Sequence, residues 1–157
     1  MSDVIVIGGG IAGLSAAARL APDASVTVLE RESATGYHAS GRSAAVFEPN
    51  YGAPSVRALN RASEAYLRQG GYLSPRGLML LGKAEEQSAF EADVASMGLV
   101  PISVAEAREI IPVLDPAKLR YAAYHEGAQD IDTHRLLEDF ARTVRAHGGQ
   151  VLTGHPV

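Results

Sequence analysis

The sequence predicts an α/β fold that begins with a parallel strand, helix and strand unit and continues into part of a second, α+β domain. Val4–Ile7 and Val26–Leu29 are uncharged, largely β-branched runs, typical of strands buried on both faces of a parallel sheet. Between them, Ile11–Leu20 is rich in Ala and Leu and stops before Pro22, which predicts the crossover helix. The unit takes about 30 residues, the length of a βαβ crossover.

The remaining elements follow from apolar spacing, caps and helix breakers. Residues 33–54 are crowded with Gly, Ser and Ala without periodicity, so we expect a functional loop there. Ser103 and Glu106 form a capping box that opens a short helix, and Pro112 ends it. Further helices are predicted at 55–69, at 84–97 and from Asp132 or Thr133 to Ala146, and strands at 77–81, at 120–125 and from Val151.

Composition narrows the class of protein. The chain has 157 residues, 46% of them hydrophobic and 20% charged, and a net charge of −4, which fits a globular domain without a basic surface for nucleic acid. The absence of Cys excludes disulfides, thiolate metal sites and any cofactor linked through sulfur. The uncharged stretch 4–18 is too short and too rich in glycine for a membrane span, and no targeting signal is visible, so we expect a cytoplasmic protein.

A phosphate-binding turn is predicted between the first strand and the first helix. Gly8, Gly10 and Gly13 have the G-x-G-x-x-G spacing of Rossmann-like units, in which backbone amides and the positive helix end meet a pyrophosphate. Glu30 ends the second strand, where an acidic side chain binds a ribose. Arg31 follows it and could indicate a 2′-phosphate, but Glu30 favours an unmodified ribose. The motif alone leaves both a nicotinamide cofactor and FAD open.

Several longer segments together match the pattern of a known family. They lie at 6–13, 29–31, 36–45, 50–52, 56–59, 73–76, 111–114 and 130–133. These segments resemble the FAD-dependent D-amino-acid oxidase superfamily, and within it bacterial D-arginine and related D-amino-acid dehydrogenases. The resemblance implies non-covalent FAD, with Ala12 and the glycine turn on the pyrophosphate and with Glu30 and Arg31 on the adenosine half. It also implies that residues of the following loop pass along the isoalloxazine ring, namely Gly41, Arg42, Ser43, Ala44, Ala45 and Val46.

The same resemblance implies oxidation of a D-amino acid by hydride transfer to flavin N5, which leaves an imino acid. Tyr51 matches a tyrosine on a loop over the active site, and Leu78 stands where the relatives carry a carboxylate for a cationic substrate. Because a leucine cannot pair a guanidinium, we expect neutral or apolar D-amino acids. Val46 replaces an expected histidine near the flavin. No residue of the chain is assigned as catalytic, and the five histidines show no metal-ligand spacing.

The order of motifs predicts a division of the chain into three segments. Residues 1–76 are assigned to the FAD-binding domain, 77–125 to the start of a substrate domain, and 126–157 to a return to the FAD-binding domain. Members of the family are more than twice as long, so we expect the chain to be incomplete and its partner to be the C-terminal part of the same enzyme. The alternatives are a nicotinamide-dependent Rossmann enzyme and a non-catalytic nucleotide-binding fragment. The motifs do not indicate the electron acceptor.

Overall fold

The computed structural model describes residues 1–157, which form two compact units. We call residues 1–45 and 132–157 the terminal unit and residues 46–131 the middle unit, and we describe each by itself. The division differs from the segments predicted from sequence, because residues 46–76 and 126–131 belong to the same unit as residues 77–125. The physical reason is strand pairing within the middle unit, described below.

The terminal unit is built on a parallel sheet of three strands in the order β1, β2, β9. Val6 of β1 lies opposite Val28 of β2, which in turn lies opposite Val151 of β9. The first two strands and the helix between them have the predicted bounds, and β9 begins one residue before the predicted Val151. The bounds are Val4–Ile7 for β1, Ile11–Leu20 for α1, Val26–Leu29 for β2, Thr133–Ala146 for α5 and Gln150–Leu152 for β9.

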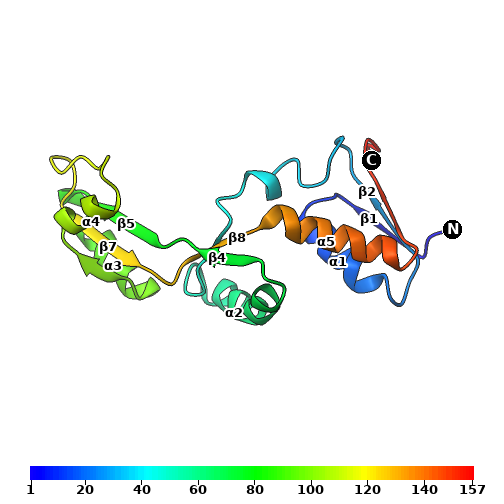
Figure 1. Ribbon diagram of the computed structural model, residues 1–157, viewed down its shortest axis with the longest axis horizontal. Coiled ribbons are helices and arrows are strands. Elements are labelled where there is room, and N and C mark those ends of the chain that lie inside the picture. Colours follow the sequence, from blue (N-terminus) through cyan, green and yellow to red (C-terminus); the bar gives the residue numbers. More distant parts are fainter. The chain divides into compact units, whose positions relative to one another are not determined.

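Two helices cover one face of this sheet. Figure 1 shows α1 and α5 side by side, and their apolar faces meet the strands in a core that includes Leu14, Val28 and Val144. Asp132 caps α5, because its Oδ1 accepts a hydrogen bond of 2.9 Å from the Arg135 backbone N–H. The opposite face of β1 stays bare, with Ile5 and Ile7 62% and 68% exposed.

The middle unit contains two antiparallel sheets of three short strands. In the first, β3 and β4 flank β8, and Asp130 of β8 lies opposite both Val46 and Ser74. In the second, β5 and β6 flank β7. The strand bounds are Val46–Phe47 for β3, Leu73–Pro75 for β4, Leu78–Gly82 for β5, Val100–Ile102 for β6, Tyr121–His125 for β7 and Gln129–Ile131 for β8.

Three α-helices complete the middle unit. They are α2 at Pro54–Gln69, α3 at Gln87–Met97 and α4 at Val104–Ile110. The helix predicted at 84–97 instead starts with a 3-10 turn at Ala84–Glu86. The capping box of α4 is confirmed: Ser103 Oγ accepts from the Glu106 N–H at 3.1 Å, and Glu106 Oε2 accepts from the Ser103 N–H at 2.8 Å. The Ser103 hydroxyl, which also donates to that carboxylate, lowers the pKa of Glu106.

Strand pairing explains the boundary between the units. β3 and β4 both pair with β8, so residues on either side of α2 are tied to residues 129–131. An ion pair of 2.6 Å between Arg76 Nη1 and Asp130 Oδ1 adds to this link. No helix of the chain combines the length and the apolar character that crossing a bilayer requires.

Candidate functional site

The glycine turn between β1 and α1 has the backbone geometry that its sequence predicts. Gly8 has φ of +101°, a conformation that residues with a Cβ rarely adopt. A Cβ on Gly13 would overlap the carbonyl oxygen of Gly8, so only glycine lets α1 start this close to the turn. Gly10 is the N-cap of α1 and Ala12 lies in its first turn. The amides at this helix end, together with the helix dipole, favour an anionic group.

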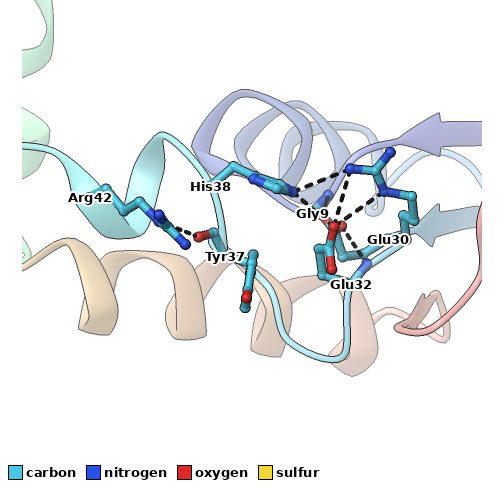
Figure 2. Close-up of polar contacts among 7 residues, drawn as sticks. Gly9, Glu30, Glu32, Tyr37, His38 and Arg42 are labelled. Atoms are coloured by element: carbon cyan, nitrogen blue, oxygen red, sulfur yellow. Dashed lines mark hydrogen bonds and ion pairs between the residues drawn. The ribbon is translucent and has the colours of Figure 1, made fainter.

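Glu30 is a buried carboxylate beside this turn, held by two backbone amides. Its Oε2 accepts from the Gly9 N–H at 2.7 Å and its Oε1 from the Glu32 N–H at 2.9 Å (Figure 2). The bond from Glu32 is the largest cause that lowers the pKa of Glu30, and the bond from Gly9 adds to it against the effect of burial. Glu30 is therefore an ionised acceptor, and each oxygen keeps a lone pair for a ribose hydroxyl.

Arg31 takes part in a polar cluster at the end of β2, together with Glu32 and His38. Glu32 Oε1 accepts from Arg31 Nε at 3.2 Å and lies 2.9 Å from His38 Nε2 (Figure 2). The hydrogen bond with His38 is the largest cause that lowers the pKa of Glu32. His38 is thus a partner of Glu32, and the sequence carried no signal for that pair.

The loop after β2 folds back onto the glycine turn. The Gly36 N–H donates to the Gly9 carbonyl at 2.9 Å, and the Gly36 carbonyl accepts from the Gly41 N–H at 2.7 Å. Ser40, in the 3-10 turn Ser40–Arg42, accepts from the Ile11 N–H at 2.9 Å through its hydroxyl oxygen. The Ser40 hydroxyl therefore lies at the N-terminus of α1 with its own proton free to donate.

The residues predicted along the flavin divide between the two units. Gly41, Arg42, Ser43, Ala44 and Ala45 close the first segment of the terminal unit. Arg42 Nε donates to the Tyr37 carbonyl at 3.3 Å, and its guanidinium carbon lies 5.5 Å from the centre of the Tyr37 ring. Ser43 Oγ accepts from the Ala45 N–H at 3.1 Å.

Ala45 and Val46 mark the passage between the units. Ala45 is the one non-glycine residue of the chain with a positive φ, at 52°. Val46 is the first residue of β3, opposite Asp130, and belongs to the middle unit. A left-handed alanine at this passage is the kind of local strain that accumulates at functional sites.

The two predicted substrate residues both lie in the middle unit. Tyr51 is 63% exposed, and its backbone N–H donates to the Glu48 carbonyl at 3.1 Å. Leu78 opens β5 and packs against the apolar cluster of Phe90, Leu99 and Ala123. Tyr51 is not part of that cluster. The structure brings together no group of three or more potential metal ligands.

Comparison with known proteins places this geometry in a family. Residues 3–157 match the family model described as FAD dependent oxidoreductase. L-2-hydroxyglutarate dehydrogenase of Escherichia coli strain K12 is 38% identical over 81 residues, which cover 45% of this chain and 19% of that protein.

Solved structures show the same fold. Glycine oxidase of Bacillus cereus matches with a TM-score of 0.80 and 19% identity over 98% of this chain and 46% of that chain. L-α-glycerophosphate oxidase of Mycoplasma pneumoniae, solved with FAD bound, matches with a TM-score of 0.78 and 16% identity over 98% of this chain and 44% of that chain. The chain therefore spans less than half the length of these two proteins and about a fifth of the curated relative.

Proposed function

Because this chain belongs to the FAD-dependent oxidoreductase family, we propose that it supplies the cofactor site and part of the substrate site of an enzyme that oxidises D-amino acids with neutral or apolar side chains. The observation that carries the cofactor assignment is the ionised Glu30 carboxylate, hydrogen-bonded to the Gly9 amide beside the glycine turn. The glycine turn alone is compatible with a nicotinamide cofactor or with FAD, and membership of the family selects FAD.

The residues of the terminal unit fit the diphosphate and ribose of FAD. The α1 N-terminus, with Gly10, Ala12 and Gly13, would meet the pyrophosphate, and the Ser40 hydroxyl would donate to a phosphate oxygen. Glu30 would accept from a ribose hydroxyl, and Arg31 would lie along the adenosine half. The segment from Gly41 to Val46 would line the isoalloxazine ring with small side chains and backbone amides. When bound, FAD accepts the hydride from the substrate Cα.

The substrate proposal rests on Leu78. Its side chain packs on an apolar cluster of the middle unit, so a substrate side chain beside it would meet hydrocarbon. A guanidinium or ammonium placed there without a carboxylate would bear a large desolvation cost. Tyr51 is exposed enough to close over a small substrate and exclude water. Leu78 therefore favours D-leucine or D-methionine over D-arginine.

A 2-hydroxy acid is the second candidate substrate. The E. coli relative that matches 45% of the chain is named L-2-hydroxyglutarate dehydrogenase. A 2-hydroxy acid and a 2-amino acid present the same carboxylate and the same oxidisable carbon, and they differ in the group that must lose a proton.

We also propose that a further polypeptide segment completes the enzyme by covering the bare face of β1. Ile5 and Ile7 lie 62% and 68% exposed on adjacent positions of that face. Both side chains project from one face of β1, and apolar side chains that lie together at a surface are typical of interfaces. The structural neighbours extend to more than twice the length that this chain covers.

The test is anaerobic reduction of the enzyme's flavin. Absorbance is followed as D-leucine, D-methionine, D-arginine or L-2-hydroxyglutarate is added. We expect D-leucine or D-methionine to bleach the flavin bands at lower concentration than D-arginine. Faster reduction by L-2-hydroxyglutarate would move the assignment to the second candidate. A colourless protein that binds NADH would contradict both.

A further inference from the structure

A buried carboxylate and a histidine form a hydrogen-bonded pair in the middle unit. Glu48 follows β3, and its side chain is only 3% exposed. His125 is the last residue of β7, and its Nδ1 lies 2.5 Å from Glu48 Oε2. The second oxygen of Glu48 accepts from the Asn50 N–H at 3.0 Å. Each oxygen of the carboxylate therefore accepts a hydrogen bond, and the group is held in one orientation.

This arrangement fixes the tautomer of His125. An ionised carboxylate can only accept hydrogen bonds, so Nδ1 carries the proton that joins the pair. In the neutral ring the other nitrogen, Nε2, then presents a lone pair. No protein group hydrogen-bonds to Nε2, and the side chain is 28% exposed. A Cβ on Gly127 would lie 2.8 Å from Nε2, so glycine at this position keeps the nitrogen accessible.

The pair also joins the two residues predicted to bind substrate. Leu78 is directly opposite His125 in the antiparallel pairing of β5 with β7, so both side chains lie on one face of the sheet. The Glu48 carbonyl accepts from the Tyr51 N–H at 3.1 Å. A substrate side chain in contact with Leu78 would therefore lie beside the imidazole.

Apolar side chains lie on the same face of this sheet as the imidazole. Leu78 of β5 and three side chains of α3, Phe90, Val94 and Met97, belong to one apolar cluster with Ala123, two residues before His125 on β7. Glu48 is the one charged group that contacts the ring.

We propose that His125 Nε2 accepts the proton that the substrate loses during oxidation, with Glu48 as its positioning residue. This inference rests on the proposed function. The substrate Cα–H bond would break with both of its electrons leaving as hydride, which is the electron transfer that bound FAD would accept. One N–H proton of an ammonium, or the O–H proton of a 2-hydroxy acid, passes to Nε2 as the C=N or C=O bond forms. The imidazolium that results is stabilised by the Glu48 carboxylate, as in other carboxylate and histidine pairs.

The experiment compares flavin reduction by the holoenzyme and three variants, His125→Gln, Glu48→Gln and His134→Gln. His134 is an exposed residue of α5 and serves as the matched control. General-base catalysis contributes roughly 10²- to 10⁴-fold. We expect His125→Gln to lower the rate of flavin reduction by that factor and to remove the decline of the rate at acidic pH. Glu48→Gln should lower the rate of flavin reduction at least tenfold. A glutamine amide can donate a hydrogen bond to Nδ1 as well as accept one, so it can stabilise the tautomer that carries its proton on Nε2.

A second readout does not depend on turnover. Nitrogen-15 NMR of the unmodified holoenzyme at neutral pH should show His125 protonated on Nδ1, and Glu48→Gln should change that pattern. His134→Gln should leave the rate and the His125 signal unchanged.

Several outcomes separate this inference from the proposed function. If the flavin of the unmodified enzyme is reduced, and flavin-loaded His125→Gln has the same rate and pH profile, the proton-acceptor role is overturned while the function stands. If His125→Gln does not fold, a flavin-loaded Glu48→Gln with the unmodified rate and tautomer overturns it. If neither amino acids nor 2-hydroxy acids reduce the unmodified enzyme, both proposals fail.

Discussion

Replacing Glu30 by Gln tests the cofactor site most directly, because the change removes one charge and almost no volume. The two oxygens of Glu30 accept from the Gly9 N–H at 2.7 Å and from the Glu32 N–H at 2.9 Å. A glutamine side chain has one oxygen, so one of these amides would face an NH₂ group and lose its acceptor. Leaving a buried donor unpaired costs about 1–3 kcal/mol. We therefore expect the protein without FAD to lose roughly 2 kcal/mol of unfolding free energy.

The same substitution should weaken FAD binding further. A hydrogen bond from a ribose hydroxyl to an ionised carboxylate contributes about 1.5–3 kcal/mol, which corresponds to roughly a 10- to 150-fold rise in Kd. Urea denaturation of the FAD-free protein measures the first effect, and titration of FAD fluorescence measures the second.

Glu138→Gln is the matched control, since Glu138 is an exposed residue of α5 in the same unit and loses the same charge. The reasoning would be refuted if Glu30→Gln and Glu138→Gln changed the unfolding free energy and the FAD affinity equally. It would also be refuted if Glu30→Gln weakened neither.

Four other changes have defined outcomes. The pKa of Glu30 is lowered in the folded protein, so the free energy of unfolding should decrease as the pH falls below about 4.3, the ordinary glutamate pKa. In urea titrations at a series of pH values, Glu30→Gln should make that decrease shallower. Gly13→Ala should destabilise by about 1–3 kcal/mol in thermal unfolding, although alanine in a helix normally stabilises, because its Cβ meets the Gly8 carbonyl. Leu78→Glu should raise the D-arginine to D-leucine ratio of kcat/KM by about 10- to 150-fold. Ser103→Ala should cost about 1 kcal/mol in urea denaturation through loss of the α4 cap, and no loss would contradict the capping box.

The βαβ unit was predictable because its determinants are local. The runs at 4–7 and 26–29 have no charge and the helix between them has good helix formers, so propensity and pattern agree with the fold. The spacing from Gly13 to Glu30 follows from the length of one crossover, and in the structure the Glu30 carboxylate accepts from the Gly9 amide of the turn. The role of Ser40 was missed, because its bond to the Ile11 amide spans 29 residues of chain.

The middle unit was harder to predict for a physical reason. Its strands β3, β4, β6 and β8 have two or three residues each, too few to show alternation. Their pairing depends on residues far apart, as where Val46 and Ser74 both lie opposite Asp130. The boundary predicted after residue 76 therefore fell inside a unit whose strands are joined across that point.

Glu30 and Glu48 show where the limit of sequence reasoning lies. Both are buried carboxylates that accept a backbone amide, but the partner of Glu30 is fixed by a crossover of known length, whereas His125 lies 77 residues from Glu48. No spacing rule joins such a pair, and only the antiparallel sheet of the middle unit puts His125 opposite Leu78. Because Glu48 and His125 act through one hydrogen bond, their effects on the rate of flavin reduction should not be additive. The double variant should be no slower than His125→Gln alone, whereas two independent roles would multiply the losses.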